Sequence, residues 1–227
     1  MDMSGLFIAN FFQNPYYCAM WALVIVFSIC CHEFAHAWMA LQQGDSTAAE
    51  QGHLTLNPLK QMGVFSLIMM AIMGIAWGAV PVNPSRMKHK YSAALVSFAG
   101  PLMNLILFLI FLMGFSLASY YLDVRELKEN RQLLVNICNI FFIGSTGNIL
   151  LFLLNLLPLP VLDGWNVFVY IFPRMQKIVT GSEFIKAMYL ILIILFITFI
   201  DQIMFVCESL IVIVSRLLMI LFYYAGL

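Results

Sequence analysis

Charged side chains are scarce in this chain: 10% of its 227 residues are charged, whereas 63% are hydrophobic. An ordinary soluble domain carries roughly 25% charged residues. With so little charge the chain cannot cover the surface of a water-soluble globule, so lipid must be the solvent for most of it. The 11 basic and 11 acidic residues also cancel. We therefore expect no binding of nucleic acid, which depends on a basic face.

Two further features are missing, a positively charged N-terminal segment and an even set of cysteines. No Lys or Arg precedes Lys60, whereas a secretory signal peptide starts with basic residues. We therefore expect the first apolar run to be retained as a membrane span. The five cysteines lie mostly inside apolar runs, which favours small buried hydrophobic side chains over disulfide partners.

Long apolar runs are what the chain has instead, and a transmembrane helix needs about 20 mainly apolar residues. The runs that approach or exceed this length are 16–41, 62–80, 92–121, 133–157 and 184–227. Glycines break the second run, which either spans the membrane or re-enters it. The last run is too long for one ordinary span. Two helices divided at Asp201, or one span and an interfacial helix, both fit.

These runs predict an all-α polytopic membrane protein with about four to six transmembrane helices and a short β-hairpin after the first. The hairpin rests on the alternation of polar and apolar residues at 51–56, which an Asn-Pro pair ends. No internal repeat or soluble appendage is found, so residues 1–227 are expected to form a single membrane-embedded domain. Its catalytic core is expected at about 16–172, followed by C-terminal apolar helices at 184–227.

The first run contains a His-Glu-x-x-His sequence, made by His32, Glu33 and His36. On a helix, residues four apart lie about 40° from each other around the axis, so both imidazoles can bind one metal ion. Glu33 can then take a proton from a water molecule that zinc has acidified to a pKa of about 7. Ionisable residues inside a bilayer are costly and typical of functional sites. The competing interpretation is a hydrogen-bonded cluster that only fixes helix packing.

A third protein ligand is needed, because a catalytic zinc ion usually has three of them plus water. His53 and His89 are candidates, but both lie in polar loops. Asp163 follows Pro158 and Pro160, which cannot continue a helix. Such a break inside a membrane survives only where protein or a water-filled cavity satisfies the backbone. Local features leave open whether Asp163 is a ligand or caps the turn before the following glycine.

Four motifs, in this order, resemble the site-2 protease family of intramembrane metalloproteases. They are the His-Glu-x-x-His motif, a hairpin-like segment at 52–59, an Ala-Gly-Pro-x-x-Asn element at 99–104, and a segment at 155–164 that is similar to the family's Asn-Pro-Asp-Gly motif. Together they cover most of the chain. The sequence departs from the family pattern at His53, where relatives commonly have Arg.

The resemblance implies a zinc metalloendopeptidase that cuts transmembrane or membrane-proximal segments of its substrates. It implies that His32, His36 and Asp163 bind one zinc ion per chain and that Glu33 is the general base. The implied partners are a transmembrane protein substrate and the lipid bilayer. The implied location is a bacterial cell (inner) membrane, as a multi-pass protein. The alternative is a membrane transporter, or a protease-like binder that does not cleave, using the same cluster.

Two asparagines and one segment are candidates for substrate binding. The resemblance suggests that Asn104 and Asn155 contact the substrate backbone or stabilise the oxyanion, where an amide donor contributes several kcal/mol. A helix–helix hydrogen bond is the alternative role for each asparagine. The strand expected at 53–56 is a further candidate, because an unwound substrate could pair with its edge.

Overall fold

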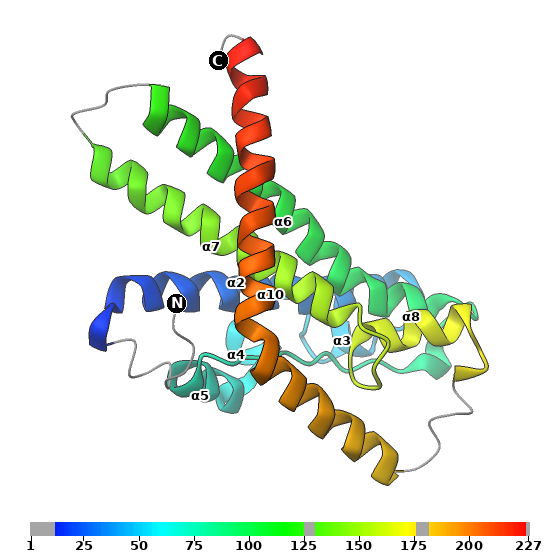
Figure 1. Ribbon diagram of the computed structural model, residues 1–227. Helices are drawn as coiled ribbons and strands as arrows, with labels where there is room; N and C mark the ends of the chain where they lie inside the picture. Colours follow the sequence, from blue (N-terminus) through cyan, green and yellow to red (C-terminus); the bar gives the residue numbers. More distant parts are fainter. Residues whose placement is uncertain (1–11, 125–129, 176–181, 226–227) are drawn as a thin grey trace.

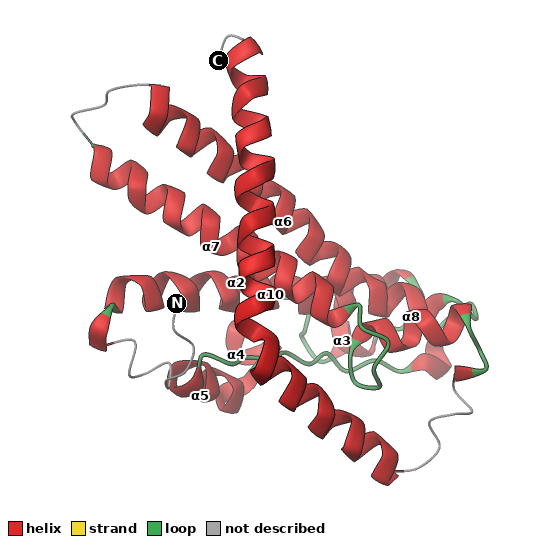
Figure 2. Ribbon diagram, in the orientation of Figure 1, coloured by secondary structure: helices red, strands yellow, loops and turns green. Residues whose placement is uncertain are grey.

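The computed structural model describes residues 12–124, 130–175 and 182–225, and the regular elements of this part are helices (Figure 2). Four of the described helices are long and apolar enough to cross a membrane. They are α2 (Pro15–Gln42), α6 (Ser92–Val124), α7 (Arg131–Asn155) and α10 (Ser182–Ala225). The prediction of an all-α membrane protein is confirmed, with the number of candidate spans at the lower end of the expected range.

Helices α6 and α7 form an antiparallel pair at the centre of the molecule (Figure 1). Glycines allow the two helices to approach closely. A side chain at Gly114 of α6 would overlap the ring of Phe141 on α7, and one at Gly144 of α7 would overlap the ring of Phe111 on α6. Close packing of this kind drives helix association where lipid replaces water. Helix α2 packs against both members of the pair.

The second apolar run, 62–80, contains no helix that is long enough to cross a membrane. It forms α5 (Gly63–Met73), which has 11 residues and is only about 16 Å long at 1.5 Å per residue, roughly half of the hydrocarbon thickness. Gly74 ends α5 with a φ of 73°, a left-handed conformation that glycine adopts without strain. Residues 75–83 then continue as an extended chain (Figure 2). The chain turns back after Gly74, because Trp77 hydrogen-bonds to Ser66 and Ala79 to Gln61, and this shape is compatible with the re-entrant arrangement.

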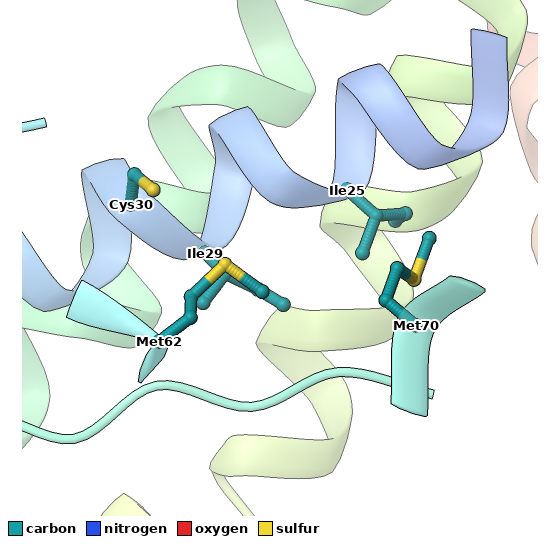
Figure 3. Packing of buried hydrophobic residues seen from close by; sticks show 5 residues of the cluster. All are labelled: Ile25, Ile29, Cys30, Met62 and Met70. Atoms are coloured by element: carbon teal, nitrogen blue, oxygen red, sulfur yellow. The ribbon is translucent and has the colours of Figure 1, made fainter. Parts of the chain in front are cut away.

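A cluster of buried hydrophobic side chains holds α5 against α2 (Figure 3). Met62, at the end of α4 (Pro58–Gln61), and Met70 of α5 pack with Ile25 and Ile29 of α2. Flexible thioether side chains are suited to filling irregular gaps between helices. Because the cluster lies about one helical turn before the histidine motif, it fixes the re-entrant segment beside that motif.

No strand forms at 51–56, so the predicted β-hairpin is wrong. These residues make turns and bends after α3 (Thr47–Glu50). The side-chain amide of Gln61 donates hydrogen bonds to the backbone carbonyls of His53 and Thr55, at 2.8 and 2.5 Å. A single buried side chain therefore occupies groups that a partner strand would need. The alternating leucines that suggested a strand are exposed instead of facing a sheet.

The C-terminal run forms one continuous helix, α10, without the expected division at Asp201. No proline or glycine occurs between Ser182 and Ala225, so no residue of this kind interrupts the helix. It is bent (Figure 1), and its part from Thr198 to Ala225 has the length and hydropathy of a membrane span. One span with a helical extension therefore describes this run better than two separate helices.

Candidate metal centre

Three of the predicted ligand residues meet at one point inside the fold. His32 and His36 lie on one face of α2 and are buried, and Asp163 is the first residue of α8 (Asp163–Ile171). The two Nε2 atoms are 2.9 Å apart. Oδ2 of Asp163 is 3.1 Å from Nε2 of His32 and 3.2 Å from Nε2 of His36. The three donor atoms thus form a nearly equilateral triangle.

A tight turn of the chain brings Asp163 into this position. Helix α7 ends at Asn155, and the two prolines that follow prevent its continuation. Val161 has a φ of 129°, which is strained for a β-branched residue and is typical of segments that are fixed by a functional site. Gly164 allows α8 to start at once, because a Cβ atom there would overlap the backbone carbonyl oxygens of residues 156 and 157.

Both imidazole rings are oriented by an acceptor on their other nitrogen. Nδ1 of His36 lies 2.7 Å from the backbone carbonyl oxygen of Val96, which can only accept, so the ring proton is on Nδ1. Nδ1 of His32 lies 2.6 Å from Oδ1 of Asn104 and donates in the same way. Each Nε2 therefore presents a lone pair to the other and to the Asp163 carboxylate. Three electron-rich atoms this close repel one another unless a cation lies between them.

Zinc fits this set of donors. It takes His nitrogen and carboxylate oxygen at about 2.0–2.2 Å in tetrahedral geometry, so neighbouring ligand atoms lie roughly 3.3 Å apart. The observed separations of 2.9, 3.1 and 3.2 Å are close to this value. An aspartate carboxyl group has an ordinary pKa of about 3.9, well below neutral pH. The carboxylate is therefore ionised and ready to bind a cation.

Glu33 and two glycines complete the immediate surroundings of the ligands. Glu33 is buried and lies next to His32 on α2. A Cβ atom at Gly78 would overlap the Glu33 carboxylate, and one at Gly100 of α6 would overlap Nε2 of both histidines. Backbone with no side chain therefore lies directly against Glu33 at Gly78 and against the two histidines at Gly100.

A cavity of about 560 Å³ opens beside the triangle, within the usual range for small-molecule and peptide-sized sites. Glu33 lines it, together with the extended segment from Ala76 to Val80 and the turn around Val161. Glu33, the three candidate ligands and an extended stretch of backbone therefore share one cavity. This arrangement can activate water against a carbonyl group that is presented along the extended segment.

The two predicted asparagines occupy different places. Asn155 lines the cavity, and its Nδ2 donates a hydrogen bond to the backbone carbonyl of Leu151. Asn104 is fully buried, and both its Oδ1 and its Nδ2 are engaged inside the protein, with His32 and Asn148. Its geometry matches support of a ligand better than contact with a substrate. The role of Asn155 toward substrate stays a prediction.

The alternative third ligands, His53 and His89, lie outside the one group of potential metal ligands found in the described residues. The sequence analysis gave no role to three residues near the site, Gly78, Gly100 and Asn148, although Gly100 belongs to the Ala-Gly-Pro-x-x-Asn element. The signal for Asn148 was present, because a lone amide in an apolar run needs a partner. Gly78 gave no such signal, and the motif around Gly100 does not reveal its contact with the two histidines, because both contacts depend on which side chains of α2 face the glycines.

Comparison with known proteins adds a second line of evidence. Residues 20–199 match the sequence model of peptidase family M50. The chain belongs to peptidase family M50. The resemblance to the site-2 proteases is therefore confirmed, and the zinc, protease and membrane-helix interpretations agree with the family and with the names of its members below.

Curated relatives of this M50 chain carry names of one kind. "Putative zinc metalloprotease YwhC" of Bacillus subtilis is 37% identical over 148 residues, which are 64% of this chain and 65% of that protein. "Putative zinc metalloprotease Rip2" of Mycolicibacterium smegmatis is 32% identical over 194 residues, 80% of this chain and 69% of that protein. Rip2 of Mycobacterium tuberculosis is 27% identical over 192 residues. The chain thus spans about two thirds of the length of these relatives, and no solved structure matches it.

Proposed function

We propose that this M50 chain is an intramembrane zinc metalloendopeptidase that hydrolyses peptide bonds in transmembrane or membrane-proximal segments of protein substrates. The observation that carries the proposal is the triangle of three unprotonated ligand atoms, formed by His32, His36 and Asp163, with Glu33 beside it on a cavity. The family and the names of the relatives support peptide hydrolysis over the transporter alternative.

Each polar residue of the site has a part in this reaction. Zinc held by His32, His36 and Asp163 would polarise the scissile carbonyl and lower the pKa of the attacking water to about 7. Glu33 takes the proton of that water and passes it to the leaving amine. Asn155 uses one amide hydrogen on the Leu151 carbonyl, so its second amide hydrogen is available for a substrate carbonyl.

The extended segment 75–83 replaces the expected strand at 53–56 as the candidate for substrate pairing. The hydroxyl group of Ser66 donates a hydrogen bond to the backbone carbonyl of Trp77 and accepts one from the backbone N–H of Trp77. The N–H of Ala79 donates to the carbonyl of Gln61. Alternate residues of an extended chain point their backbone groups to opposite sides, so residues 77 and 79 bond to the α4–α5 side of the segment.

The residues between them, Gly78 and Val80, point their backbone groups the other way. Among the described residues none donates to or accepts from these groups, and both residues line the cavity. An unwound substrate segment can therefore add itself as a strand along this edge. Its scissile carbonyl would then lie beside Glu33, which contacts Gly78.

A transmembrane protein and the lipid bilayer are the proposed partners, with a bacterial cell membrane as the location. Four candidate spans support the membrane setting, and the matched relatives come from bacteria. His32 lies about 25 Å along α2 from Pro15 at 1.5 Å per residue. Helix α2 continues for about 15 Å beyond His32, so the site lies in the C-terminal half of this candidate span.

Zinc content and cleavage, measured on the same purified samples, test the assigned roles. We expect one zinc ion per chain in the wild type and in Glu33→Gln, and weakened zinc binding in Asp163→Ala. Cleavage of a generic transmembrane substrate should fall at least about 100-fold in both variants. His89→Ala is the control and should keep both properties. Cleavage that survives in Glu33→Gln, or a wild type without zinc after metal-replete purification, would refute the proposal.

Proline at position 80 tests the pairing of substrate with the extended edge. Val80→Pro removes one N–H of the open edge and fits extended backbone, so zinc content should stay the same while the KM for a helical substrate rises. Val80→Thr changes the side chain, keeps the N–H, and is the matched control. Equal KM values for Val80→Pro and Val80→Thr would show that this edge does not bind substrate.

A further inference from the structure

A chain of buried polar side chains leads from His32 into the packed interior. Nδ1 of His32 is 2.6 Å from Oδ1 of Asn104 on α6, and Nδ2 of Asn104 donates a 3.0 Å hydrogen bond to Oδ1 of Asn148 on α7. Nδ2 of Asn148 in turn donates 2.9 Å hydrogen bonds to Oγ of Ser28 and to the backbone carbonyl oxygen of Gly144. Both asparagines and Ser28 are fully buried.

The hydrogen bond from Asn148 to the backbone carbonyl of Gly144 fixes the direction of the other hydrogen bonds in this series. The carbonyl oxygen of Gly144 can only accept, so Asn148 must turn its nitrogen toward it and its oxygen toward Asn104. Asn104 must then present its nitrogen to Asn148 and its oxygen to His32. An amide oxygen accepts, so Nδ1 of His32 carries the proton and Nε2 is left with a lone pair.

From this geometry we infer that Asn148 is a positioning residue of the zinc centre. It holds the amide of Asn104 in one orientation and thereby keeps His32 in the tautomer that can bind metal. Asn148 is connected to His32 through Asn104, by two successive hydrogen bonds. It therefore touches no reacting atom. The inference rests on the zinc binding in the proposed function and extends it from the ligands to the packing of α7.

Without Asn148, the hydrogen bond that holds the amide of Asn104 in this orientation would be lost. With an apolar side chain at 148, the amide of Asn104 can turn over and offer its NH₂ group to His32. Nδ1 of His32 then becomes an acceptor, and the ring proton moves to Nε2, where it blocks metal binding. Partners of metal ligands typically change metal affinity by roughly 10–100-fold when they are removed.

Zinc affinity, measured by competition with a chelator on the purified full chain, tests this role. Asn148→Leu should weaken zinc binding by roughly 10–100-fold, whereas Asn139→Leu, an exposed asparagine on the same helix, should not change it. If Asn148 acts through Asn104, adding Asn148→Leu to Asn104→Leu should cause no further loss. Unchanged affinity in a folded Asn148→Leu, or losses that add up in the double variant, would overturn the inference.

The tautomer of His32 can also be observed in the zinc-free wild type, by ¹⁵N NMR of labelled histidine. We expect the proton on Nδ1 in the wild type and loss of this preference in Asn148→Leu. A wild-type proton on Nε2 would overturn the inference even where the variant fails to fold. Neither measurement depends on cleavage, so a chain that binds zinc with these properties but cuts no peptide would refute the proposed function alone.

Discussion

At the scale of single residues, two glycines lie directly against the candidate ligands and Glu33. Gly100 of α6 faces the two ligand nitrogens, and Gly78 of the extended segment faces the Glu33 carboxylate. At both positions a methyl group would occupy space that a functional atom already fills. The two sites differ in which part of the reaction they would disturb, so they can be separated by experiment.

Gly100→Ala should impair zinc binding. The added methyl group would overlap Nε2 of His32 and of His36 and would push at least one ring out of the triangle. We expect a loss of zinc affinity of at least roughly 10-fold, measured by chelator competition. Leu102→Ala, on the partly exposed face of the same helix turn, should bind zinc like the wild type. Full zinc affinity in Gly100→Ala would mean that α6 can move away from α2.

Gly78→Ala should impair catalysis and leave zinc in place. Its methyl group would displace the Glu33 carboxylate, whose atoms are the nearest to it. We expect kcat for a peptide substrate to fall about 100-fold or more, as for loss of a general base, with one zinc ion still bound. Ala76→Gly, which adds no atom to the same segment, is the control. A normal kcat in Gly78→Ala would contradict the placement of Glu33.

At the scale of elements, Asp45 ties the end of α2 to the end of the extended segment. Its Oδ1 accepts hydrogen bonds from the N–H and the hydroxyl of Thr47, and its Oδ2 accepts one of 2.6 Å from the N–H of Asn83. Burial alone would raise the pKa of Asp45, but these hydrogen bonds outweigh it and hold the pKa below its usual value. The carboxylate of Asp45 therefore connects the chain after α2 to the end of the extended segment.

This connection through Asp45 should weaken at low pH and in Asp45→Asn. Because the folded-state pKa is lowered, the contribution of Asp45 to stability is present above the unfolded-state value of about 3.8 and is lost as the pH falls through the lower folded-state value. Asp45→Asn sets an NH₂ group against an N–H donor and should cost about 1–3 kcal/mol at pH 7. Thermal unfolding in detergent between pH 7 and pH 3 measures both effects. A difference between wild type and Asp45→Asn that grows toward low pH would contradict this account.

The elements also differ in how well the sequence predicts them. Long apolar runs specify α2, α6 and α7, because few structures other than a helix can bury so much backbone in lipid. The alternation at 51–56 was misleading, because Leu54 and Leu56 are exposed and Gln61 takes the backbone groups that pairing would use. Such a side-chain cap depends on how α4 packs, which local pattern does not contain.

The residues of the candidate site also differ in how well the sequence predicts them. Spacing alone places His32 and His36 on one face of a helix, and the broken segment makes Asp163 a candidate. The closeness of Gly100 and the connection to Asn148 arise only when α6 and α7 pack against α2. The grouping of His32, His36 and Asp163 was therefore predictable from the chemistry of these residues, whereas contacts that depend on how the helices pack were not.

At the scale of the whole molecule, the proposed zinc ion would join α2 to α8 at a point that α6 encloses. A ligand that binds only the folded state stabilises it by mass action, by about 4 kcal/mol at 1,000 times its Kd. Removal of zinc with a chelator should therefore lower the Tm of the wild type in detergent, with a clearly smaller shift in Asp163→Ala. An equal Tm with and without chelator would argue against a shared site between these helices.

The distribution of the ligands along the chain has a consequence for biogenesis. His32 and His36 lie in the first candidate span, whereas Asp163 follows the third. During synthesis the histidines enter the membrane long before the carboxylate that completes the triangle has left the ribosome. We therefore expect that a nascent chain cannot bind zinc with all three candidate ligands until the turn before α8 has closed.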